Sequence, residues 1–105
     1  MTTYVITVPG TFVNGVPDAA RSDIERRLRS RDPKNTDLGE SEELSLLSVE
    51  EGGMFSARVE VEAADRAGAE KEAVQLVSRA LRDSGFPERD APLGPPFVTG
   101  IDREF

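Results

Sequence analysis

The stretch SLLSVEEGGMFSARVEVEA, residues 45–63, decides the fold, because two runs rich in branched side chains flank Gly52-Gly53. This pattern predicts a β-hairpin with strands over 44–49 and 54–61. A turn at Gly52-Gly53 pairs residues whose numbers sum to 105, and a turn at Glu51-Gly52 pairs residues whose numbers sum to 103. Both registers place the same side chains on the same face, so the assignment of faces depends only on the absence of a three-residue turn with a bulge.

Both faces of the predicted hairpin carry apolar side chains. The face expected to cover the core carries Leu44, Leu46, Phe55, Ala57, Val59 and Val61. The other face carries Leu47, Val49 and Met54 beside Ser56 and Arg58. The question is therefore what this second face contacts.

Strand and helix patterns continue on both sides of the hairpin. Alternating β-branched residues predict a strand over 2–8, and a helix is expected from Pro17-Asp18 to Pro33, followed by a polar linker over 34–43. A second, strongly amphipathic helix begins after Asp65 as N-cap and ends at Ser84-Gly85-Phe86-Pro87. After a turn-rich connection over 86–96, residues 97–101 form the last predicted strand.

The predicted order is β-α-β-β-α-β, which indicates an α+β fold in one domain, residues 1–105. Such an order most economically gives a four-stranded antiparallel sheet, strand order 4-1-3-2, with two helices on one face. The segments TTYVITV, FSARVEVEA, AEKEAVQLVSRALRDSGF and FVTGI resemble the strands and second helix of a ferredoxin-like α/β plait. The chain is also similar in its Arg, Glu and Ala content to small uncharacterised actinobacterial proteins. The resemblance implies the fold and homodimers that pack sheet against sheet, as in dimeric α/β-barrel proteins, some of which bind amino acids or metals.

Two residue types are absent from the sequence, and their absence excludes most enzyme chemistry. Without cysteine there is no disulfide, thiol nucleophile or thiolate metal site, and without histidine there is no Ser-His-Asp triad or imidazole ligand. The acid clusters at 40–43 and 50–51 lack a loop that would bring metal ligands together, so we expect neither a metal nor a cofactor.

The charge distribution argues against nucleic acids and anionic membranes as partners. The formal net charge is −7, and residues 35–65 hold nine acidic side chains with Arg58 as their one base. This pattern opposes binding to nucleic acids and to anionic membranes. The sequence has neither a basic leader nor a long apolar run, so the expected location is the cytoplasm.

The bare face of the predicted sheet is the candidate binding surface. Its expected residues are Val5, Thr7, Leu47, Val49, Met54, Ser56 and Arg58. Apolar side chains clustered on an open sheet predict a protein partner, most simply a second copy of the chain. A solvated sheet and a small-ligand cavity between two such faces are the alternatives.

Arg58 is the polar residue of most interest on that face. Its guanidinium can clamp a carboxylate or phosphate, but a cross-strand or intersubunit pair with Glu43, Glu60 or a neighbour is favoured because acids dominate the region. The predicted function is a non-enzymatic interaction or accessory module that forms homodimers through the open sheet face. The alternatives are a regulatory domain that binds a small carboxylate-bearing ligand, with a pocket between sheets or under 86–96 and with Arg58 and Thr7 as anchors, and a histidine-free isomerase or cyclase. We assign no catalytic residue.

Overall fold

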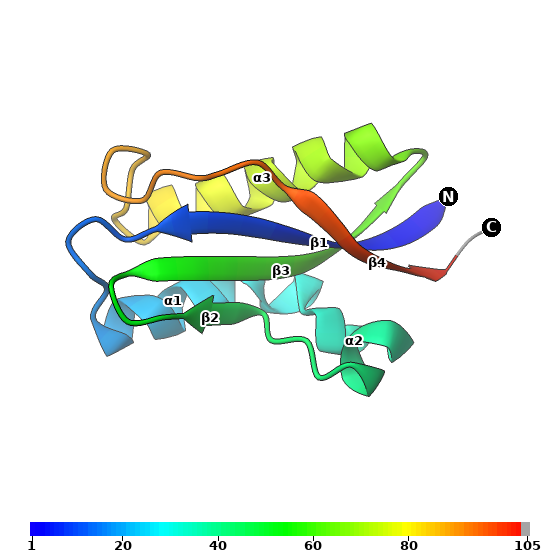
Figure 1. Ribbon diagram of the computed structural model, residues 1–105, viewed down its shortest axis with the longest axis horizontal. Coiled ribbons are helices and arrows are strands. Elements are labelled where there is room, and N and C mark those ends of the chain that lie inside the picture. The colour runs from blue at the N-terminus through cyan, green and yellow to red at the C-terminus, as the bar shows by residue number, and fades with distance from the viewer. Residues whose placement is uncertain (104–105) are drawn as a thin grey trace.

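The computed structural model describes residues 1–103 and shows a four-stranded antiparallel sheet with three α-helices (Figure 1). The strands are β1 (Thr2–Thr11), β2 (Leu47–Val49), β3 (Met54–Ala63) and β4 (Phe97–Arg103). The α-helices are α1 (Asp18–Leu28), α2 (Asp37–Ser41) and α3 (Arg66–Asp83), and two short 3-10 helices, η1 (Arg29–Arg31) and η2 (Pro33–Asn35), follow α1. No helix within residues 1–103 is both long enough and apolar enough to cross a membrane.

The strand order is β2-β3-β1-β4, which counted from the β4 edge is β4-β1-β3-β2. The two long strands β1 and β3 therefore form the centre of the sheet and pair along their whole length, from Thr2 opposite Ala63 to Thr11 opposite Met54. The strand predicted over 2–8 thus continues through Pro9-Gly10. It does so because the 92–94 segment pairs with it there: the Thr11 N–H donates to Pro92 O, and the Gly94 N–H donates to Pro9 O.

The main core lies between one face of the sheet and the helices α1 and α3. Tyr4, Ile6 and Val8 of β1 alternate inward and lie opposite Val61, Val59 and Ala57 of β3. Against this surface α1 buries Ile24 and Leu28, and α3 buries Ala69, Ala73, Val77, Ala80 and Leu81. The apolar stripe predicted for the second helix is therefore the one that packs on the sheet.

Both ends of α3 form as its sequence predicts. The Asp65 carboxylate accepts a hydrogen bond from the Gly68 N–H at 2.7 Å, which caps the first turn. At the other end Gly85 adopts a positive φ of 94°, and the Phe86 N–H returns to Leu81 O at 2.8 Å. This left-handed termination turns the Phe86 side chain back toward the core, where it meets Phe12 edge to face.

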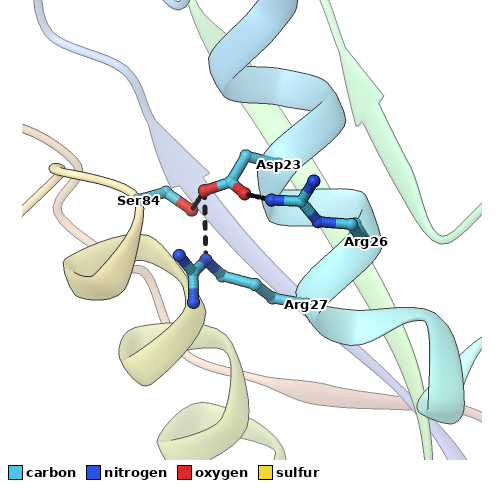
Figure 2. A network of polar contacts seen from close by, with 4 residues as sticks. All are labelled: Asp23, Arg26, Arg27 and Ser84. Atoms are coloured by element: carbon cyan, nitrogen blue, oxygen red, sulfur yellow. Dashed lines mark hydrogen bonds and ion pairs between the residues drawn. The ribbon is translucent and has the colours of Figure 1, made fainter.

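A polar network connects α1 to the end of α3 (Figure 2). The Asp23 carboxylate accepts hydrogen bonds from Ser84 Oγ at 2.8 Å, from Arg27 Nε at 3.0 Å and from the Arg26 guanidinium. The hydrogen bonds from Ser84 and Arg27 lower the pKa of Asp23 below its usual value. Arg26 and Arg27, two of the five arginines of residues 21–31, thus pair with Asp23 of their own helix, and Asp23 in turn contacts Ser84 at the end of α3.

The hairpin register differs from both registers expected from the sequence. Leu47 lies opposite Ala57 and Val49 opposite Phe55, so the residue numbers sum to 104 and not to 105 or 103. The turn contains three residues, Glu51-Gly52-Gly53, and the Glu50 N–H closes it by donating to Met54 O at 2.7 Å. Both Gly52 and Gly53 have positive φ values, which allows this longer turn. A change of one residue in the sum transfers every β2 side chain to the opposite face.

The segment predicted as a polar linker is instead folded and packs on the sheet. Thr36 caps α2 by accepting a hydrogen bond from the Gly39 N–H at 2.9 Å, and the Leu38 N–H donates to the Asp102 carboxylate of β4 at 2.8 Å. A side chain at Gly100 would run into the Leu38 side chain, and Gly100 lies opposite Val5. Since Val5 faces away from Ile6 and the main core, α2 lies on the sheet face opposite to α1 and α3. The expected arrangement has two helices on one face and leaves the other face bare. The structure differs because the third helix, α2, covers part of that other face.

Candidate functional site

The outer face of the sheet is divided into a covered half and an uncovered half. Helix α2 lies over the half that contains Val5 and Gly100, and Val5 is fully buried there. Toward the hairpin turn the face stays open. We call this part the uncovered strip and define it by the outward-facing residues Thr7, Pro9, Ser48, Met54, Ser56, Arg58, Phe97 and Thr99.

The uncovered strip consists of side chains in rows across neighbouring strands. Arg58 of β3, Thr7 of β1 and Phe97 of β4 are direct neighbours in one row, because Thr7 is the register partner of both other residues. In the next row Ser56 lies between Ser48 and Pro9. Side chains at directly opposed positions are within contact distance of each other, so each row acts as one continuous surface.

The polar groups of the uncovered strip pair mostly with one another. The hydroxyls of Thr7 and Thr99 share a hydrogen bond, which satisfies the buried Thr7 side chain. The Arg58 Nη1 donates to Ser48 Oγ at 3.3 Å. Among residues 1–103 no carboxylate lies within ion-pair distance of Arg58. Within the chain the expected cross-strand pairs with Glu43 or Glu60 do not form, and the neighbour that Arg58 contacts is a serine.

Two apolar side chains of the uncovered strip are exposed to solvent. Met54 is 60% exposed and Phe97 is 50% exposed. Phe97 faces outward because β4 has a register shift between its pairings with Val5 and Ile6, which puts Thr99 at an irregular position. A half-exposed aromatic side chain in the same row as a guanidinium that has no carboxylate partner is a combination typical of protein interfaces.

The structure brings together four of the seven residues predicted for this face. Thr7, Met54, Ser56 and Arg58 lie on the uncovered strip, as expected. Leu47 and Val49 are on the core side, so their assignment to the open face was wrong; the three-residue turn is the physical reason. Val5 does face outward, but it is buried beneath α2 and unavailable to a partner.

Sequence reasoning missed four residues of the uncovered strip, and the first is Pro9, which lies beyond the strand predicted over 2–8. Ser48 was excluded by the register error, and its position depends on the turn length alone. Phe97 and Thr99 belong to the last predicted strand, which was not assigned to either face. Their alternation on either side of Val98 was a signal for a shared face, and the pairing of Val98 with Ile6 shows which face is the inner one.

Glu60 borders the uncovered strip, next to the part of the sheet that α2 covers. Partial burial raises the pKa of this carboxyl, and the charges of Glu62 and Asp102 raise it further, while Arg31 lowers it. The ionised carboxylate therefore costs folding free energy at neutral pH. This cost disappears as the pH falls through the raised folded-state pKa toward the unfolded-state value.

We therefore expect Glu60→Gln to increase the free energy of unfolding at pH 7 and to leave it nearly unchanged at about pH 3.5, below the ordinary pKa of glutamate. Urea denaturation at the two pH values measures this difference. Glu51→Gln, on the exposed hairpin turn, removes the same charge from the molecule and serves as the control for the general effect of net charge. An equal gain in both variants would show that the local environment of Glu60 is not the cause.

A mainly apolar groove lies on the other side of the sheet. It has a volume of about 440 Å³ and is formed by α3 and the 86–96 loop. Arg58 and Thr7, the anchors predicted for a ligand under this loop, do not line it. The Arg58 site and this groove are therefore separate.

Comparisons with known proteins identified no relative of this chain. No protein-family model matches the chain, and the searches of curated proteins and of solved structures returned no match either. Within residues 1–103 no three His, Cys, Asp or Glu side chains are arranged so that they could hold a metal ion. The uncovered strip and the groove are therefore the two surfaces of this chain that indicate a function.

Proposed function

We propose that the protein is a non-enzymatic interaction module that forms a homodimer through the uncovered strip. The observation that carries this proposal is the position of Met54 and Phe97, both at least half exposed, on the same sheet face as an arginine without a carboxylate partner. Burying these apolar side chains against a second surface is favourable, and the guanidinium then gains a partner.

The charge pattern of β3 supports a second copy as the partner. Arg58, Glu60 and Glu62 alternate along the outer side of this strand. If two copies stack with their β3 strands antiparallel about a two-fold axis, Arg58 of each copy faces the acids of the other. The surface is then complementary to itself, which an isologous dimer requires.

We infer a ferredoxin-like plait with an added helix, supported by the central β1 and β3 and by the two long helices on one face. The addition is α2, which restricts the stacking surface to half of the sheet. A dimer of this type therefore buries the half near the hairpin turn together with Glu60 and Glu62 on the adjoining outer side of β3, and it leaves α2 at its border.

The oligomeric state tests the proposal directly. Size-exclusion chromatography with light scattering at tens of micromolar is expected to give twice the mass of one chain. Phe97→Asp should give a monomer, because a charge would have to be buried at the interface. Ile101→Asp is the matched control: this side chain is also 50% exposed on β4 but pairs with Tyr4 and so points toward the other face.

A charge exchange examines the proposed contact between the copies. Arg58→Glu should weaken the dimer, and the double variant Arg58→Glu with Glu62→Arg should restore it in part. Circular dichroism verifies that each variant is folded. A monomeric wild-type protein, or a dimer that Ile101→Asp disrupts while Phe97→Asp does not, would exclude the uncovered strip as the interface.

A further inference from the structure

We propose that the groove between α3 and the 86–96 loop binds a small primary amine with an apolar body. The groove is remote from the uncovered strip, so this inference is independent of the proposed dimer. Its lining is mainly apolar, with Val74 and Leu81 on α3 and Phe86, Ala91 and Leu93 on the loop. Its volume of about 440 Å³ is within the range usual for small-molecule sites.

Both walls of the groove are held in place in the absence of a ligand. The loop is attached to β1 and the segment after it by three backbone hydrogen bonds, from Thr11 to Pro92, from Val13 to Asp90 and from Gly94 to Pro9, at 2.8–3.1 Å. The Phe86 ring is fixed against Phe12, with ring centroids 5.3 Å apart. A site that is already formed does not lose binding free energy to loop ordering.

The hydrogen-bonding groups of the groove determine the class of ligand. Pro95 and Pro96 have no N–H group, and the N–H groups of Phe86, Ala91 and Gly94 already donate to other backbone carbonyls. The lining contains no lysine or arginine, and its one charged side chain is Glu88. Apart from the Ser78 hydroxyl, the side chains and these backbone groups offer acceptors and not donors.

This inventory distinguishes between ligands of the same shape. An ammonium group can donate hydrogen bonds to the Glu88 carboxylate while its hydrocarbon part lies against Leu81, Phe86 and Leu93. A carboxylate or phosphate in the same position would meet Glu88 without a compensating cation. The groove therefore favours an amine over the carboxylate-bearing ligand predicted from the sequence for a pocket under this loop.

Three probes with the same aromatic body test the inference: 2-phenylethylamine, 2-phenylethanol and phenylacetate. Calorimetric titration at pH 7 is expected to give about fivefold tighter binding for the amine than for the alcohol, the size of effect that a solvent-exposed ion pair can supply. Phenylacetate should bind more weakly than the alcohol. Amide chemical shifts of Ser78 and Gly94 should change on titration with the amine, which locates the bound probe.

Two variants separate the charge from the shape of the groove. Glu88→Gln should reduce amine binding to the level of the alcohol, whereas Glu51→Gln on the distant hairpin turn should leave it unchanged. Ser78→Phe should fill the groove and abolish binding of both. If Ser78→Phe does not fold, the chemical-shift changes in the wild-type protein decide the location. Shift changes confined to other surfaces, absence of amine binding, or phenylacetate binding as tight as the amine would overturn the inference.

Discussion

Phe12→Ala is expected to lower the free energy of unfolding by about 3–5 kcal/mol, the largest loss that we expect from a single substitution in this chain. Phe12 is 1% exposed and follows directly after β1. Its ring contacts Phe55 of β3, with centroids 4.4 Å apart, and Phe86 after α3, with centroids 5.3 Å apart. Removing the ring leaves a cavity where the hairpin, the end of β1 and the end of α3 meet, and it also removes two aromatic contacts.

Urea denaturation of the variant measures this loss. Val13→Ala is the control, because the neighbouring side chain is 58% exposed and should change the free energy of unfolding by no more than about 0.5 kcal/mol. A loss below about 1 kcal/mol for Phe12→Ala would mean that the surrounding residues close the cavity, and that this aromatic cluster is not the main tertiary connection between the three segments.

Gly39→Ala is expected to detach α2 from the sheet. Gly39 is buried within α2, and a Cβ at this position would overlap the backbone carbonyl of Pro33 in η2. Because the obstacle is backbone, no side-chain rotation removes the overlap, and α2 must move away from η2. We expect a loss of about 1–3 kcal/mol, the usual cost of overpacking a close contact.

The displacement of α2 has a local signature. Backbone amides around Val5 and Gly100 should exchange with solvent faster in Gly39→Ala, while those of Val77 and Val59 in the main core should stay protected. Ser41→Ala changes an exposed residue of the same helix and should affect neither the stability nor the exchange. Unchanged exchange at Val5 in the glycine variant would show that α2 is not what buries this residue.

The parts of the structure that sequence reasoning predicted are those with repeated local signals. The helix over 66–83 has a capping aspartate, an apolar stripe from Ala69 to Leu81 and a glycine termination, and all three features agree. The inner face of β3 was also assigned correctly, since Phe55, Ala57, Val59 and Val61 alternate without interruption. In these segments the residues near one another in sequence determine the structure.

The errors occur where a local sequence permits more than one backbone conformation, or where the structure depends on contacts between residues far apart in the sequence. The pair Gly52-Gly53 can adopt positive φ at both positions, so it permits turns of two or three residues, and that choice moved Leu47 and Val49 to the core side. Helix α2 contains Leu38 as its single large apolar residue, too few for a helical period to be recognised. The burial of Val5 depends on this helix, which lies more than thirty positions away in the sequence.

The path of the chain between α1 and β2 also has a consequence for aggregation. Since β2 has three residues, it leaves the far end of β3 without a neighbouring strand, and η1 and η2 lie against β3 instead. Free strand edges are sites where a foreign strand can add and where fibrils can start. The β3 edge is thus protected from pairing with further strands. At the opposite edge of the sheet, the irregular pairing at Thr99 bends β4, and a bent strand is a poor template for the addition of another strand.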